Sequence, residues 1–264
     1  MAMTITENVA APPVVDPEVW QREREALLVR EKAHTREGDA IAAARRRLPM
    51  YEVDAGAVLV GDGGERTLEE VFDDRSQLIL KKHMFHTGKP LEHQCMGCTY
   101  NIWNIHDASY LHAEDVTFAV VADGPWSEVA PFRDFMGYQV PWYSSERLDR
   151  DGLEHLFGGT WGGFAFYLRR GESVYLTYET TARGNDRFMP ALNLLDSTVY
   201  GRQEEWEDSP EGWPQRPTFT HWRTDEHGNA IGARGHGRPT PQWTRPGATP
   251  VGGTHRAPDW PGLE

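Results

Sequence analysis

Five side chains that could transfer electrons or bind a metal ion lie within sixteen residues of this sequence. They are His83, His86, His93, Cys95 and Cys98. The two cysteines are the only ones in the chain, and the two residues between them give the spacing of a redox pair or of half a metal site. Two cysteines cannot form the disulfide network typical of small secreted domains. The segment therefore predicts thiol redox chemistry or metal binding.

The first possible chemistry is exchange between a dithiol and a disulfide. The cysteines precede a stretch with helical spacing, and the positive end of a helix dipole stabilises a thiolate. Cys95 is nearer the preceding loop, which makes it the expected nucleophile. Cys98, one helical turn further on, would then resolve the mixed disulfide. This hypothesis needs no metal.

The second possible chemistry uses a transition metal, because thiolate and imidazole are the ligands that zinc and copper prefer. Two cysteines and two of the three histidines would complete a structural zinc site. Copper is favoured over zinc as the cofactor, since the thiolates would stabilise Cu(I) and the histidines would support Cu(II). All five residues, His83, His86, His93, Cys95 and Cys98, are therefore candidate metal ligands.

These residues predict an oxidoreductase with a Cys/His reaction centre. In the favoured hypothesis it binds copper or zinc and oxidises a small organic or thiol substrate, with Cys95 and Cys98 as the catalytic pair. One alternative is a metal-free dithiol-disulfide oxidoreductase. A second is a metal carrier or sensor that performs no chemistry, and a third is a structural zinc clip in an interaction domain.

The elements around this cluster alternate between strand and helix patterns. An apolar run at residues 77–80 and a longer one at 116–123 are typical of buried strands, and residues 127–137 fit a helix that stops at Gly137. Two alternating runs around residues 170–172 predict a β-hairpin, and residues 187–201 predict the last helix. The pattern predicts an α/β fold with the cysteines between a strand and a helix.

The ends of the chain differ from this central part. Residues 1–15 are expected to form a flexible arm, and residues 16–50 a helical element with Pro17 in its first turn and Gly38 as a candidate break. Residues 51–205 would form the main domain, and residues 206–264 an irregular tail rich in Trp, Pro and Gly. A long charged helix cannot bury its apolar residues alone, so a homodimer is a possible assembly.

Charge and hydropathy exclude several classes of partner. The chain has 264 residues, and 27 Lys and Arg against 40 Asp and Glu give a formal net charge of −13. Such a surface would repel nucleic acid and anionic membranes, which leaves a small-molecule substrate as the expected partner. The sequence has neither a run of about 18 apolar residues nor the pattern of a signal peptide, so a cytoplasmic location is expected.

Several blocks of the sequence together resemble a bacterial family catalogued as domain of unknown function eight-nine-nine. They are residues 23–49, the strand SQLILKKHMF, the following C-x-x-C, PWYSS and the segment 178–202. The resemblance implies a thioredoxin-like three-layer sandwich, with the cysteine pair at the start of its main helix. It also implies a relation to the peroxiredoxin and alkyl hydroperoxide reductase group. Where that family usually has a histidine in this strand, this chain has Lys82, with His83 and His86 nearby.

Overall fold

The computed structural model describes residues 9–91, 94–105, 107–158, 161–204 and 206–215. The expected helical element lies within these residues, and so does nearly all of the expected main domain. The first eight residues of the predicted arm and the predicted tail from residue 216 onward lie outside them. None of the helices in the described part of the chain combines the length and hydropathy that a membrane span needs.

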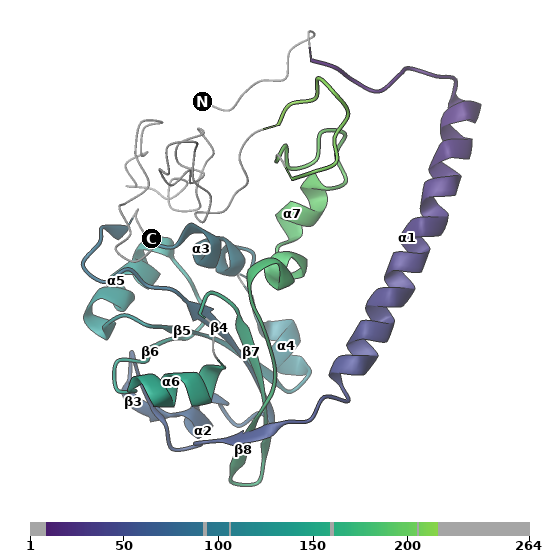
Figure 1. Ribbon diagram of the computed structural model, residues 1–264. Coiled ribbons are helices and arrows are strands. Elements are labelled where there is room, and N and C mark those ends of the chain that lie inside the picture. The colour runs from purple at the N-terminus through teal and green to yellow at the C-terminus, as the bar shows by residue number, and fades with distance from the viewer. Residues whose placement is uncertain (1–8, 92–93, 106, 159–160, 205, 216–264) are drawn as a thin grey trace.

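One mixed sheet forms the centre of the described structure, in the order β1-β8-β7-β4-β5-β6-β2-β3 (Figure 1). The strands are β1 (Tyr51–Val53), β2 (Val58–Gly61), β3 (Gly64–Thr67), β4 (Gln77–His83), β5 (Val116–Ala122), β6 (Trp142–Ser144), β7 (Phe164–Arg170) and β8 (Ser173–Thr180). The apolar run at 116–123 was expected to form a buried strand. β5 lies between β4 and β6, parallel to both, and all of its residues after Val116 are buried.

Four adjacent strands of this sheet, β8-β7-β4-β5, have the topology of a thioredoxin-like fold. β4, the helix α3 (Met96–Trp103) and β5 make a parallel βαβ unit, and β7 and β8 make the antiparallel hairpin that the sequence predicted. β7 pairs antiparallel with β4, which gives the order β8-β7-β4-β5. The predicted α/β class and thioredoxin-like architecture are therefore confirmed.

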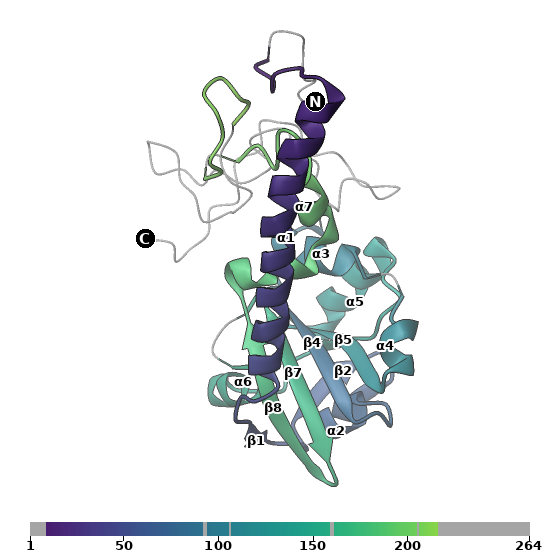
Figure 2. The same cartoon turned by 90° about the vertical axis from the view of Figure 1, so that its right-hand side faces the viewer.

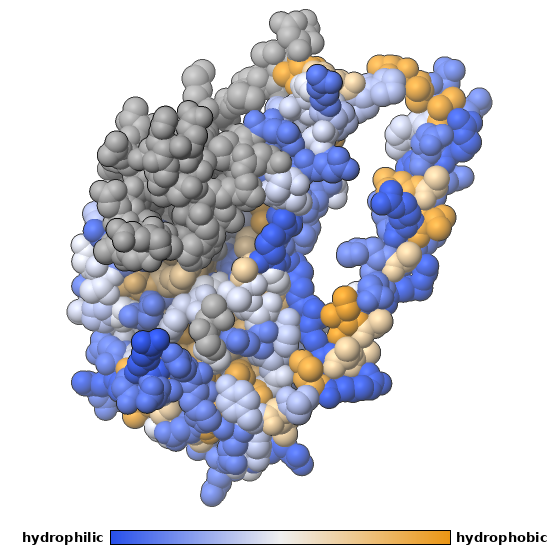
Figure 3. Space-filling view, in the orientation of Figure 1, coloured by the Kyte–Doolittle hydropathy of each residue, from blue (hydrophilic) through white to orange (hydrophobic). Residues whose placement is uncertain are grey.

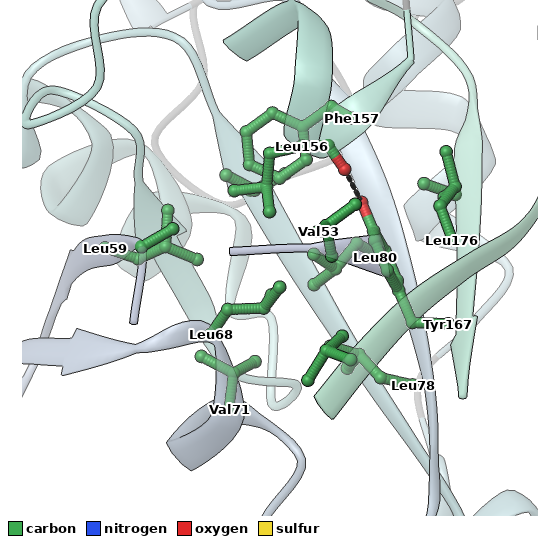
Figure 4. Close-up of a cluster of buried hydrophobic side chains, with 14 of the residues drawn as sticks. Val53, Leu59, Leu68, Val71, Leu78, Leu80, Leu156, Phe157, Tyr167 and Leu176 are labelled. Carbon is green, nitrogen blue, oxygen red and sulfur yellow. Dashed lines mark hydrogen bonds between the residues drawn. The ribbon is translucent and has the colours of Figure 1, made fainter. Parts of the chain in front are cut away.

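Helices cover both faces of the sheet and complete three layers. One face packs against α2 (Leu68–Val71) and α6 (Arg150–Phe157), and Figure 4 shows the side chains of this cluster. The other face packs against α3, α4 (Ser109–Ala113) and α5 (Trp126–Met136). α5 ends where the sequence predicted, because Gly137 adopts the left-handed conformation, with a φ of 67°, that terminates helices.

Strand alternation divides the residues of β4 between these two layers. Leu78 and Leu80 belong to the cluster on the α2 and α6 side, whereas Ile79 packs on the α3 and α5 side. Successive side chains of a strand point to opposite faces. Lys81 and His83 therefore face α3, and Lys82 faces away from it.

Two predicted helices have different limits in the structure. Gly38 does not break the first helix, because α1 runs without interruption from Pro17 to Arg45. The helix predicted over residues 187–201 is shorter: a 3-10 helix, η2 (Ala182–Phe188), comes first and α7 spans only Pro190–Leu195. Pro190 explains the boundary, since proline has no N–H to donate and disfavours helical geometry in the residue before it.

Helix α1 extends along the outside of the domain (Figures 1 and 2). None of its residues is buried, and its final residue, Arg45, places its guanidinium over the ring of Tyr178 at 5.2 Å. Figure 3 shows apolar residues along this helix and open space between it and the domain. In proteins most of the stability of a helix comes from tertiary packing of one of its faces, so a partner surface for α1 is expected.

We expect α1 to pair with α1 of a second copy. Trp20, Leu27 and Ile41 are 58%, 50% and 42% exposed and recur at intervals of seven and fourteen residues, which places them on one helix face. Sedimentation velocity at micromolar concentration should give a dimer, and Leu27→Glu should convert it to a monomer. Val29→Glu, on the opposite face, is the matched control and should stay dimeric. A monomeric wild type would contradict this prediction.

Candidate functional site

The two cysteines lie at the start of α3, between β4 and β5 in the chain. Cys95 is the N-cap residue and Cys98 lies in the first turn; both are free thiols, each 2% exposed. Gln94 fixes the turn before them, because its side-chain oxygen accepts from the His86 N–H at 2.8 Å and its amide donates to the His86 carbonyl at 3.1 Å. The strand and the helix thus hold both sulfurs inside the domain.

A buried lysine shares this interior with the sulfurs. Lys81 lies two strand positions from the end of β4 and has no exposed surface. Its ammonium donates to the carbonyls of Gly162 at 2.7 Å and Gly163 at 3.4 Å, and lies 5.0 Å from the centre of the Phe164 ring. These neighbours are neutral. No carboxylate among the described residues forms an ion pair with Lys81, and the charges that raise its lowered pKa back towards normal come from Cys98 and Cys95.

Lys81 and nearby hydrogen bonds give the two cysteines different acidities. Burial raises the pKa of Cys98, but the hydrogen bond from the Cys95 thiol, the charge of Lys81 and the Met84 N–H, 3.4 Å from the sulfur, outweigh it and lower the pKa to about 6. The hydrogen bond to Cys98 and burial raise the pKa of Cys95. At neutral pH the pair therefore holds one thiolate, on Cys98, and one thiol.

This arrangement differs from the sequence-based expectation that Cys95 would carry the thiolate. That expectation used the helix dipole and closeness to the loop, but both sulfurs are equally buried at the same helix end. The nearby charge and N–H donor decide between them, and these favour Cys98.

A buried carboxyl acts against the thiolate. Asp123 follows β5 and accepts a hydrogen bond from the Phe85 N–H at 2.5 Å. Burial raises the pKa of Asp123 to about 6, and its negative charge raises the pKa of Cys98. The hydrogen bond from Cys95, the charge of Lys81 and the Met84 N–H act in the opposite direction and lower the pKa of Cys98.

The three histidines near the cysteines have different positions. His83 is fully buried among aromatic rings, with its Nε2 3.4 Å from the Thr99 hydroxyl, and burial keeps its pKa well below normal, so the ring stays neutral. Its Nδ1 has no hydrogen-bond partner among the described residues. His86 is half-buried in the turn held by Gln94, and His93 lies outside the described residues.

The metal hypothesis gains no support from these positions. Within the described ranges, which omit His93, the structure brings together no group of three or more His, Cys, Asp or Glu side chains able to hold a metal ion. The predicted copper or zinc ligands His83, His86, His93, Cys95 and Cys98 stay a prediction.

The sequence analysis did not single out the buried lysines as site residues. Lys82, on the opposite face from Lys81, donates to the Phe157 carbonyl and to Glu179 Oε2, both at 2.7 Å. The sequence contains a feature that points to them: two lysines directly follow the apolar residues of a strand that a parallel sheet would bury. Buried lysines require partners, so their position in that strand indicates a structured polar site.

A glycine-rich segment supplies the carbonyls around Lys81. Gly162 and Gly163, just before β7, provide these two carbonyls. A Cβ atom on Gly163 would lie only 1.9 Å from the Thr180 carbonyl oxygen, so no other residue fits without moving the backbone. The absence of a side chain lets this segment pass close to β8 while its carbonyls reach the lysine on β4.

Fold and site together define a thioredoxin-like protein with a buried C-x-x-C pair. A family model described as "Bacterial protein of unknown function (DUF899)" matches residues 9–227, and the chain belongs to that family. This confirms the resemblance noted from the sequence. No curated protein matches the chain.

Solved structures with a similar fold share little sequence with this chain. The peroxidoxin BcpB from Mycobacterium tuberculosis is 14% identical with a TM-score of 0.35, and the match covers 57% of this chain and 96% of that one. A putative protein disulfide isomerase from Bacteroides thetaiotaomicron is 16% identical with a TM-score of 0.35, covering 55% and 85%. The Xanthomonas campestris bacterioferritin comigratory protein is 14% identical with a TM-score of 0.33, covering 56% and 94%.

The acidity of Cys98 gives a testable pH dependence. The ultraviolet thiolate absorbance of the reduced protein should rise with a midpoint near pH 6, because the lowered pKa keeps the thiolate down to that pH. Cys98→Ser should remove this transition. Cys95→Ala should raise its midpoint, since alanine has no donor to replace the hydrogen bond that favours the thiolate. A wild-type midpoint near the ordinary value of 9.0 would contradict the assignment.

The contact of Lys82 with Glu179 should contribute to stability. Glu179→Gln leaves the buried ammonium without a countercharge, and the free energy of unfolding in urea should fall by about 1–3 kcal/mol, since Glu179 is partly exposed. Glu172→Gln, an exposed change in the same hairpin, is the control and should alter it by less than about 0.5 kcal/mol. Equal effects of the two changes would contradict a structural role for this ion pair.

Proposed function

We propose that this protein is a dithiol-disulfide oxidoreductase whose catalytic residues are Cys95 and Cys98. The observation that carries the proposal is the enclosure of both sulfurs with the Lys81 ammonium at the start of α3. Lowered thiol pKa values are typical of reactive cysteines, whereas a structural cysteine in an apolar interior keeps its proton. The cysteine spacing is that of a pair able to close a disulfide within one helical turn.

The chemistry follows from this arrangement. In the reduced protein the Cys98 thiolate is the stronger nucleophile at neutral pH, because the thiolate and not the thiol attacks a disulfide. Attack on a substrate disulfide forms a mixed disulfide and releases one substrate thiolate. Cys95 then loses its proton and attacks the Cys98 sulfur, which closes the protein disulfide and releases the second substrate thiolate. Two electrons pass from the protein to the substrate, and a substrate dithiol can return them to the protein disulfide.

The residues around the pair have supporting roles in this proposal. His83 stays neutral and packs against α3 through Thr99, so it positions the helix rather than supplying charge. Thr99 also donates from its hydroxyl to the Cys95 carbonyl at 2.8 Å, which closes the first turn behind the sulfurs. The metal-dependent hypothesis, with copper favoured over zinc, is not needed for this chemistry.

The proposal is tested by following the thiols through oxidation. Treatment of the wild type with oxidised glutathione should remove both free thiols and leave a protein with an internal disulfide and no bound glutathione. Cys95→Ser and Cys98→Ser should each lose turnover of a dithiol or disulfide substrate and instead retain one glutathione per chain. Serine is nearly the same size as cysteine, so both variants should stay folded.

Elemental analysis of the same preparations separates this function from the metal-dependent one. Stoichiometric copper or zinc in the purified wild type, with activity lost on chelation and restored by the metal, would overturn the metal-free proposal. Wild-type protein that forms no internal disulfide would also overturn it.

A further inference from the structure

The two adjacent lysines of β4, Lys81 and Lys82, are both buried but have different partners for their charge. Each ammonium has no exposed surface, and burying a charge is costly unless it is paired. Lys82 has a carboxylate partner, Glu179, at 2.7 Å. Lys81 is surrounded by two backbone carbonyls and an aromatic ring, and forms no ion pair with any carboxylate in the described residues.

The anionic groups that act on the Lys81 ammonium are the sulfurs of Cys98 and Cys95, and Cys98 also forms a side-chain hydrogen bond with it. In the reduced protein a thiolate can lie near the ammonium and compensate its charge. Formation of the disulfide converts both sulfurs to a neutral group, and the buried ammonium then keeps only its dipolar neighbours. The oxidised site thus loses an electrostatic interaction that the reduced site has, in a medium of low dielectric constant where that interaction is strong.

From this imbalance we propose that Lys81 makes the site a thiol oxidant, so that its disulfide accepts electrons from dithiol substrates. This inference rests on the proposed dithiol-disulfide function and adds the direction of electron flow and the substrate class. Stabilising the reduced form raises the reduction potential of a disulfide, as in strongly oxidising members of this chemistry.

The step can be written in full. A substrate thiolate attacks the Cys95 sulfur; the bond between Cys95 and Cys98 breaks, and Cys98 leaves as a thiolate near Lys81. A sulfur whose thiolate is stabilised is the better leaving group, which selects Cys95 as the sulfur that is attacked. The second substrate thiolate then attacks the substrate sulfur of the mixed disulfide. Cys95 leaves and takes up a proton, the substrate gains a disulfide, and its two electrons remain on the protein.

The first test measures the redox equilibrium of the intact protein with reduced and oxidised glutathione at neutral pH. Lys81→Met should move the equilibrium towards the protein disulfide by about tenfold or more, equivalent to about 30 mV for a two-electron couple. Lys82→Met, the adjacent residue facing the opposite layer, is the matched control and should leave it within about twofold of wild type. Equal shifts in both variants, or none in Lys81→Met, would overturn the proposal.

A second measurement uses the wild type alone, in case Lys81→Met does not fold. If the charge imbalance is real, the oxidised protein should unfold at a lower urea concentration than the reduced protein. A disulfide usually has the opposite effect, because it restricts the unfolded chain. Oxidised protein that is as stable as the reduced form, or more stable, would overturn the proposal.

These outcomes distinguish the proposed dithiol-disulfide function from the proposed direction of electron flow. A wild type that never forms an internal disulfide contradicts the proposed function, and this inference with it. A wild type that cycles between dithiol and disulfide, but is stabilised by oxidation, retains the proposed function and contradicts only the assigned direction.

Discussion

The enclosure of the Lys81 ammonium with the Cys95 and Cys98 sulfurs is the constraint on which the rest of the site depends. An ammonium can be held there only because β4 is a central strand, covered on one side by α3 and flanked by β5 and β7. The same covering removes water, so the charge acts on the sulfurs more strongly than it would in water. The segment ending in Gly163 must then come close enough to supply carbonyl oxygens, which is why a side chain there would collide with β8.

Strand alternation places the adjacent lysines on opposite faces of the sheet, where they contact different groups. Lys82 faces the layer of α6, where it joins the Phe157 carbonyl at the end of that helix to Glu179 on β8 and so links three elements of the fold. Lys81 faces α3, where its charge acts on sulfur. A one-residue shift in the register of β4 would exchange these environments and place the unpaired ammonium away from the dithiol. The pairing of β4 with β5 and β7 therefore specifies the chemistry of the site as well as the fold.

Local patterns in the sequence predicted the α/β class and the location of the cysteine pair, and the resemblance to the family implied the thioredoxin-like architecture. The hairpin of β7 and β8, the end of α5 at Gly137 and the cysteines between a strand and a helix all follow from short-range signals. The distribution of charge within the site does not follow from short-range signals. Identifying Cys98 as the thiolate requires knowing that Lys81 and the Met84 N–H reach it across the fold. The prediction of a break at Gly38 failed for a similar reason. One glycine destabilises a helix by only about 1 kcal/mol, and the helix propensity of the other residues in α1 outweighs that cost.

Charge compensation connects the redox state of the cysteines to the stability of the sheet. Glu179 is a permanent partner for Lys82, whereas the partner of Lys81 exists only while Cys98 is a thiolate. Removing two electrons from the dithiol therefore also removes the countercharge of a buried cation in the central strand. The interior would regain that countercharge by taking electrons from another thiol, which is the physical reason for the proposed direction of electron flow. Asp123 does not replace it, because its charge acts on Cys98, where it raises the pKa of the thiol, and Asp123 is not among the groups that shift the pKa of Lys81.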